Sequence, residues 1–269
     1  MGAVEHGGAA AAPQIGTCGT READWTGWLS GISRQSAVNF VPAGSRLIVL
    51  APHPDDEILA CAGLLALHDA QGGVSLIIAA TDGEASHAGC SRAPASPWAE
   101  PERFADLAQL RRGESTDGLQ HLALQSCAVM RLGLPDGGLL QHLGALQQQL
   151  DSMLSPADTL LTTWRHDAHP DHEACGLAAS RATGRCGCRL LEAPVWLWHW
   201  SHPSDDRVPW HRLAGLGLPV DVVHRKTQAL AAHRSQLAPR DGVTGPVLGP
   251  DMVRRTQRDA EYFFIQAWP

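Results

Sequence analysis

The chain has 269 residues and a formal net charge of −7, with 44% hydrophobic and 18% charged residues. These values are ordinary for a soluble globular protein, and the length suits one large α/β domain as well as two small ones. No basic block argues for a nucleic-acid partner, and no apolar run reaches the roughly 18 residues that would predict a membrane span.

The first 20 residues are rich in Ala and Gly and are expected to form a disordered tail, followed by a single domain over residues 21–269. The tail lacks the basic and long apolar regions of a signal peptide, so the expected location is the cytoplasm. The seven cysteines are odd in number and scattered along the chain, which predicts reduced thiols rather than a disulfide framework.

Segments of strand and helix character alternate along the chain. A short helix is expected at 21–36, then a β-α-β unit with the apolar run RLIVLA at 46–51, a helix at 55–69 and the apolar run VSLIIAA at 74–80. Further strands are expected at 128–132, 159–164, 189–199 and 262–266, and further helices at 101–124, 139–154, 170–182 and 225–237. Short β-α-β connections are typical of a parallel sheet covered on both faces. The predicted fold class is therefore α/β, a three-layer α/β/α sandwich with a mostly parallel, Rossmann-like sheet.

Two polar segments each follow a predicted strand and begin a predicted helix. HPDDE occupies residues 53–57, and HDAHPDHE occupies residues 166–173. Either segment alone has an ordinary explanation, as acids at a helix start or as structural histidines. Because ligands bind at the carboxyl ends of the strands in an open α/β sheet, the two segments together indicate one site at that edge.

The residue types in these segments suit a catalytic zinc ion, which takes three protein ligands and leaves a position for water. His53 and Asp56 can face one ion across the bend into the helix, and His172 can supply a third ligand from the other segment. Asp55 then lies beside the metal as a general base. His169 is expected to be a cation near the developing oxyanion or a proton donor to the leaving amine.

The two segments also carry a resemblance to a known family. The first resembles the HPDDE signature of the PIG-L/LmbE-like deacetylases, and residues 169–172 match that family's second signature, HPDH. Supporting similarities are TDGE at 81–84, RRGE at 111–114, LGLPDG at 132–137 and HRSQ at 233–236. The resemblance implies an LmbE-like fold and a zinc-dependent enzyme that deacetylates N-acetylglucosaminyl groups and related amides.

The same resemblance implies a role for each matching residue. His53, Asp56 and His172 would bind zinc, although such ligands accept other divalent metals as well. Asp55 would be the general base, and His169 would stabilise the tetrahedral intermediate.

Three further residues take their expected roles from the resemblance. Asp171 would orient a histidine, and Arg111 and Asp136 would line the sugar site. Ordinary explanations stay open for two of them: Arg111 can pair with Glu114 along a helix, and Asp136 lies in a Pro-Asp-Gly turn that favours Asp in any case.

Three features fall outside this assignment. Some family members have a tyrosine two positions before the HPDH histidine, where this chain has Asp167, so oxyanion stabilisation would rest on zinc and His169. The long stretch 85–101 is interpreted as a substrate-facing loop rather than a solvated excursion. Trp196, Trp198 and Trp200 alternate at strand period, and packing on the core is favoured over a sugar-stacking platform.

The predicted function is metal-dependent hydrolysis that removes the N-acetyl group from an N-acetylglucosamine-type amino sugar or conjugate. The first alternative is a related amidase for a non-acetyl amide of the thiol-conjugate or antibiotic-precursor type, and the second is a catalytically silent carbohydrate-binding protein. A nucleotide-binding oxidoreductase is disfavoured because residues 52–55 read PHPD where a glycine-rich phosphate loop should be. The expected partner is a small-molecule substrate, with homo-oligomerisation left open.

Overall fold

The computed structural model describes residue 15 and residues 19–86, 100–239 and 245–265. Most of the expected tail at 1–20 and most of the 85–101 segment therefore lie outside the described residues. The predictions of a disordered tail and of a substrate-facing loop fall on these residues. The described cysteines are free thiols, as expected: Cys61, Cys127, Cys175, Cys186 and Cys188. Across these described ranges, no helix is long and apolar enough to cross a membrane.

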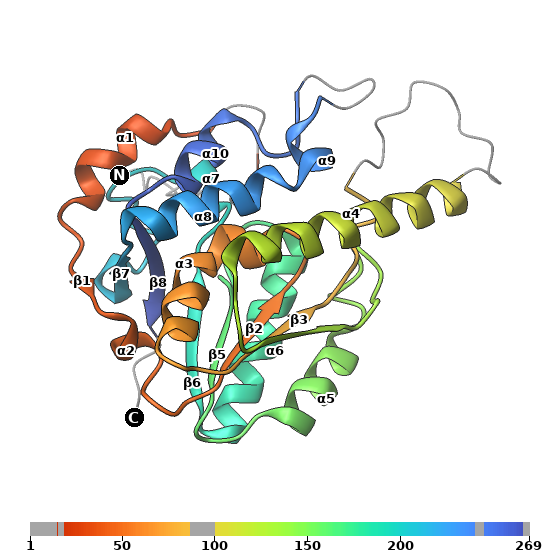
Figure 1. Cartoon of the computed structure of the whole chain (residues 1–269), viewed down its shortest axis with the longest axis horizontal. Coiled ribbons are helices and arrows are strands. Elements are labelled where there is room, and N and C mark those ends of the chain that lie inside the picture. Colours follow the sequence, from red (N-terminus) through yellow and green to blue (C-terminus); the bar gives the residue numbers. More distant parts are fainter. Residues whose placement is uncertain (1–14, 16–18, 87–99, 240–244, 266–269) are drawn as a thin grey trace, which may run out of the picture.

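One eight-stranded sheet lies at the centre of the fold, in the order β1-β7-β8-β6-β5-β2-β3-β4 (Figure 1). The strands are β1 Arg34–Gln35, β2 Leu47–Ala51, β3 Ser75–Ala79, β4 Cys127–Arg131, β5 Thr159–Thr163, β6 Arg189–Ala193, β7 Leu213–Gly217 and β8 Ala260–Ile265. Strand β8 runs antiparallel to β6 and β7, while the other neighbouring pairs are parallel. This mostly parallel sheet confirms the predicted α/β fold class.

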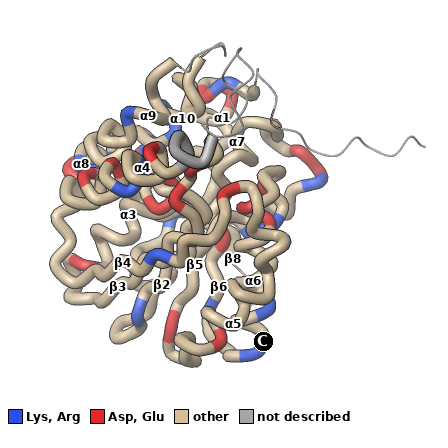
Figure 2. The backbone as a smooth tube through the Cα atoms, turned by 90° about the vertical axis from the view of Figure 1, so that its right-hand side faces the viewer, with Lys and Arg blue, Asp and Glu red and all other residues tan. Residues whose placement is uncertain are grey.

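Helices cover both faces of the sheet, which explains why the central strands are continuous apolar runs rather than alternating ones. The long helices are α3 Asp56–Ala70, α4 Glu100–Leu122, α5 Leu143–Met153, α6 Pro170–Cys186 and α8 Val220–Ala231. Successive residues of a strand point to opposite faces, so Leu47 and Val49 of β2 join the core under α3 and α8, and Ile48 and Leu50 join the core under α5 and α6. Figures 1 and 2 show the same two layers, with acidic and basic residues interspersed over the described elements.

The remaining elements are short. They are α1 Glu22–Leu29, α2 Ala37–Phe40, α7 Leu197–Trp200, a 3₁₀ turn at Trp210–Arg212, α9 Arg234–Leu237 and α10 Pro250–Thr256. Among them, α9 lies beside α4 (Figure 1). The expected helix at 21–36 thus ends at residue 29, and the expected helix at 225–237 is α8 followed by the separate turn α9.

The predicted strand at 189–199 is wrong beyond its first five residues. Strand β6 ends at Ala193, Pro194 follows, and the chain then turns into α7. The three tryptophans therefore do not share a strand face, because the segment that carries them is helical. Trp198 packs in the core, where its ring centroid lies 5.0 Å from that of Trp25. Trp196 is only half-buried and does not belong to this group of packed tryptophans.

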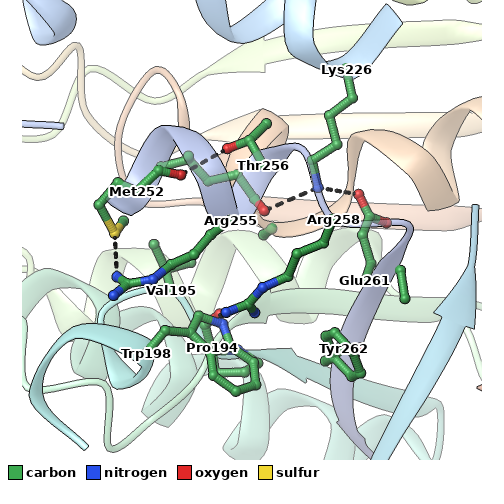
Figure 3. A pocket seen from close by; sticks show the side chains of 13 residues that line it. Pro194, Val195, Trp198, Lys226, Met252, Arg255, Thr256, Arg258, Glu261 and Tyr262 are labelled. Atoms are coloured by element: carbon green, nitrogen blue, oxygen red, sulfur yellow. Dashed lines mark hydrogen bonds and ion pairs between the residues drawn. The ribbon is translucent and has the colours of Figure 1, made fainter. Parts of the chain in front are cut away.

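A buried ion pair between Lys226 and Glu261, shown in Figure 3, lies beside a kink in α3. The kink lies at Cys61, where φ is −152°. The carboxylate of Glu261 on β8 accepts hydrogen bonds from the backbone N–H of Gly63 and of Leu64, at 2.7 and 2.8 Å. Lys226 of α8 donates to that carboxylate at 2.5 Å and to the carbonyl of Leu59 at 3.3 Å. Lys226 thereby anchors the first half of α3, which begins at the HPDDE segment, to α8, and Glu261 anchors the start of its second half to β8.

Candidate metal centre and active-site pocket

The two signature segments meet at the carboxyl ends of β2 and β5, which are adjacent parallel strands. Both line one pocket of about 290 Å³. Of the eight site residues predicted from the sequence, this pocket is lined by His53, Asp55, Asp56, Arg111, Asp136, His169 and His172. Asp171 lies directly behind it, fully buried.

Three histidines and one carboxylate form a compact cluster at the base of the pocket. One ring nitrogen from each of His53, His169 and His172 lies within 4.8 Å of the other two. Oδ2 of Asp56 lies 3.1 Å from Nδ1 of His53 and 3.3 Å from Nε2 of His172. These are the nitrogen and oxygen donors that zinc and similar divalent metals prefer, so the cluster fits a metal ion.

The charges around the cluster also favour a cation. Burial opposes protonation of His53, but Asp136, Asp171 and Asp56 outweigh it and raise the pKa of His53 well above its usual value. Burial likewise opposes protonation of His172, but Asp56 and Asp167 raise its pKa to about 9. Without a metal, these carboxylates draw protons onto both imidazoles; a divalent cation would satisfy the same negative charge.

Two carboxylates hold His53 on the side away from Asp56. Nε2 of His53 lies 3.2 Å from Asp136 Oδ1 and 3.2 Å from Asp171 Oδ2. Asp171 also accepts hydrogen bonds from the backbone N–H of Gly137 at 2.7 Å and of Leu139 at 3.1 Å. Asp171 and Asp136 thus both contact His53 on the same ring nitrogen, and the orienting role of Asp171 stays a prediction.

Asp55 lies in the pocket with an unusual backbone. Its φ of 134° is rare for a residue with a side chain and stores local strain. Its backbone N–H donates to Oε2 of Glu57 at 3.0 Å, and Arg111 donates to its carboxylate at 3.1 Å. Burial raises the pKa of Asp55 to about 7, against the opposing attraction of Arg111.

Arg111 is 2% exposed and supports the HPDDE loop. Besides Asp55, its guanidinium donates to the carbonyl oxygens of Pro54 at 2.7 Å and of Gly83 at 2.8 Å. Gly83 has a φ of 70°, and a Cβ there would lie only 1.9 Å from the guanidinium. Arg111 therefore touches the pocket, as predicted, but most of its hydrogen bonds hold the chain that carries the candidate base.

His169 is neutral in this environment. Burial, followed by the nearby imidazoles of His172 and His53, lowers its pKa to about 3. Its Nδ1 accepts a hydrogen bond from the backbone N–H of Asp171 at 3.3 Å. We infer from that bond that the ring proton is on Nε2. The lowered pKa favours a neutral N–H donor over the cation, which was one of the two roles expected for His169 from the sequence; its role stays a prediction.

Apolar residues also line the pocket, namely Leu59, Trp196, Val247 and Leu248, together with the polar residues Gln236 and Ser86. Gln236 had a signal in the HRSQ motif. Trp196 was expected to pack on the core rather than to form a sugar-stacking platform, and its place depends on where β6 ends. Leu59, Val247 and Leu248 had no signal in the sequence.

Comparison with known proteins agrees with this arrangement. A family model described as PIG-L: GlcNAc-PI de-N-acetylase matches residues 48–183, which include both signature segments. A curated Bacillus subtilis protein, the probable N-acetyl-alpha-D-glucosaminyl L-malate deacetylase 2, is 29% identical over 143 residues, or 52% of this chain. The chain spans 61% of that relative's length.

Solved structures show a similar fold. A zinc-inhibited form of the teicoplanin deacetylase Orf2 has a TM-score of 0.57 and 17% identity, covering 82% of this chain and 97% of its own. The N,N'-diacetylchitobiose deacetylase from Pyrococcus horikoshii has a TM-score of 0.53 and 16% identity, covering 74% of this chain and 73% of its own. At such low identity these structures support the fold alone.

Proposed function

The chain belongs to the PIG-L family of metal-dependent N-deacetylases, and on that premise we propose that it removes the N-acetyl group from an N-acetylglucosamine-type amino sugar or its conjugate. The observation that carries the proposal is the meeting of the two signature segments in one pocket, with a histidine and carboxylate cluster beside the separate carboxylate of Asp55. The curated relative, which is named for an N-acetyl-alpha-D-glucosaminyl substrate, supports the same substrate class.

His53, Asp56 and His172 would hold the metal ion. A bound divalent ion of this kind would polarise the acyl oxygen and acidify a water molecule. Asp171 and Asp136 hold His53 from its far nitrogen, at 3.2 Å each, which leaves Nδ1 for the metal.

Asp55 is the general base in this proposal. Arg111 occupies one side of its carboxylate and fixes its direction, and Asp55 lines the same pocket as the cluster. A carboxylate whose pKa lies near neutral pH can take a proton from water and return it to the leaving amine within one cycle.

His169 stabilises the oxyanion of the tetrahedral intermediate. Because its Nδ1 accepts from the backbone of Asp171, its Nε2–H can donate a hydrogen bond into the pocket. A neutral donor that is already oriented needs no reorganisation as the negative charge develops.

The test is acetate release from N-acetylated amino sugars and their conjugates, together with the metal content of the protein. Asp55→Ala should keep the metal and lose roughly 10²–10⁴-fold in rate, because only the base is removed. The exposed Asp206→Ala is the matched control and should keep both metal and rate. Normal hydrolysis by Asp55→Ala would refute the base assignment. Metal without acetate from any sugar would move the proposal to the alternative amidase with another acyl group.

A further inference from the structure

A single carboxylate, that of Asp167, connects the candidate metal ligand His172 with the turn that carries Trp196. We propose that Asp167 is a positioning residue that orients His172 toward the metal and fixes Trp196 as a specificity-determining side chain in the pocket wall. This inference rests on the proposed function, and it adds the substrate feature that the wall would recognise, the apolar face of a sugar ring.

Asp167 is completely buried, and both of its carboxylate oxygens are occupied. Oδ2 lies 2.8 Å from Nδ1 of His172 and accepts the backbone N–H of Trp196 at 2.9 Å. Oδ1 accepts the backbone N–H groups of Val195 and Leu197, at 3.1 and 2.8 Å. Three consecutive amides of the turn after β6 thus converge on the carboxylate that also holds the imidazole.

The hydrogen bond to Asp167 sets the direction of His172. With Nδ1 held by the carboxylate, Nε2 points toward Asp56, whose Oδ2 lies 3.3 Å away. A carboxylate on the far nitrogen of a metal-binding histidine fixes its tautomer and raises its basicity. Asp167 is absent from the pocket wall, so it does not take the place of the tyrosine that some family members carry there.

Trp196 is the side chain that this turn presents to the pocket. Trp196 lines the pocket together with the apolar residues Leu59, Val247 and Leu248, and the charged residues Arg111 and Asp136 line the same pocket. A sugar ring has an apolar C–H face and a polar edge, so a pocket lined by both kinds of side chain matches it. The volume of about 290 Å³ lies at the small end of ligand pockets and suits one sugar residue with its acyl group.

The experiment compares Asp167→Asn, Trp196→Ala and the matched control Trp28→Phe, whose half-buried ring packs against Trp210 and does not line the pocket. Zinc affinity is measured by competition with a chelator, and KM and kcat are measured on an N-acetylglucosamine conjugate. Asp167→Asn should weaken zinc binding 10–100-fold, as loss of such an outer partner does elsewhere. Trp196→Ala should leave zinc affinity and kcat unchanged and raise KM about tenfold. The control should change neither quantity.

The outcomes separate the two proposals. Unchanged zinc affinity in Asp167→Asn overturns the orienting role, and unchanged KM in Trp196→Ala overturns the specificity role. If the wild-type chain binds zinc but releases no acetate, the proposed function is overturned, while the zinc affinities still test the orienting role. If the wild-type chain binds no zinc, the proposed function and the orienting role are both overturned. If Asp167→Asn fails to fold, Asp167→Glu keeps the charge while displacing the carboxylate, and a loss of zinc affinity of about tenfold is expected from it.

Discussion

At the scale of single residues, Asp55 combines a chemical role with an unfavourable backbone. A φ of 134° costs on the order of 1–3 kcal/mol for a residue with a side chain. The cost is offset by Arg111, which binds the carboxylate and the carbonyl of Pro54, and by Glu57, which accepts the backbone N–H. In this backbone conformation Asp55 lines the pocket, while the carboxylate of Asp56 belongs to the cluster of candidate metal ligands.

Asp55→Gly should therefore be more stable than Asp55→Ala by about 1–2 kcal/mol, because glycine adopts positive φ without a Cβ clash. Both variants remove the carboxylate, and in both Arg111 loses its hydrogen bond to that carboxylate. The difference in stability between them therefore reports the backbone strain. The measurement is urea unfolding of both variants with a chelator present. Equal stability would show that the backbone of Asp55 is not strained in solution.

At the scale of elements, helix α3 depends on contacts that come from the other end of the chain. On either side of its kink, backbone groups of Leu59, Gly63 and Leu64 form hydrogen bonds with the side chains of Glu261 and Lys226. Both side chains are buried, so neither can exchange its partner for water. The position of the HPDDE segment thus depends on α8 and β8.

Lys226→Met should destabilise the protein by about 3–5 kcal/mol, because it keeps the apolar stem but leaves the charge of Glu261 buried without its partner. The exposed pair Arg34–Asp259 provides the matched control, since Asp259→Ala there should cost about 1 kcal/mol or less. Chemical unfolding of both variants measures the difference. Similar small losses in the two variants would mean that the buried pair does not hold the kink.

At the scale of the whole molecule, helices α4, α8 and α9 enclose a histidine away from water. His233 is 0% exposed, and its two ring nitrogens have no hydrogen-bond partner within the described part of the chain. It packs on α4, where its Nε2 lies 3.0 Å from the position that a Cβ on Gly118 would take. Burial, helped by Arg111, lowers its pKa to about 3.

Acid should therefore destabilise the protein partly through His233. In the unfolded chain this histidine takes up a proton below about pH 6.5, whereas in the folded chain it stays neutral down to about pH 3, so folding stability falls as the pH falls through that range. His233→Leu removes this contribution, and between pH 7 and pH 5 it should gain about 2 kcal/mol relative to wild type.

The exposed His224→Leu is the control and should follow wild type at both pH values. The measurement is the unfolding free energy of wild type, His233→Leu and His224→Leu at pH 7 and at pH 5. Parallel loss in wild type and His233→Leu would place the acid sensitivity in other groups.

Local signals identified most of the candidate site, because its chemistry is concentrated in two short segments. HPDDE and HPDH each follow an apolar strand, and adjacent parallel strands end at the same edge of a sheet, so their meeting could be expected from the sequence. The neutral state of His169 could not be expected, because it arises from burial and neighbouring imidazoles. The hydrogen bonds of Arg111 could not be expected either, because their acceptors, the carbonyl groups of Gly83 and Pro54, lie on two separate loops.

The class of fold and the meeting of the two signature segments with their polar side chains follow from local periodicity and from the geometry of parallel strands, so both could be predicted before the fold was known. Which further side chains line the pocket depends on contacts between distant parts of the chain. Pro194 and the carboxylate of Asp167 turn the chain after β6, which sends Trp198 into the core and Trp196 to the pocket. Asp167 and Trp196, whose contact stabilises that turn, are 29 positions apart in the sequence. Local periodicity does not predict a contact between such distant residues.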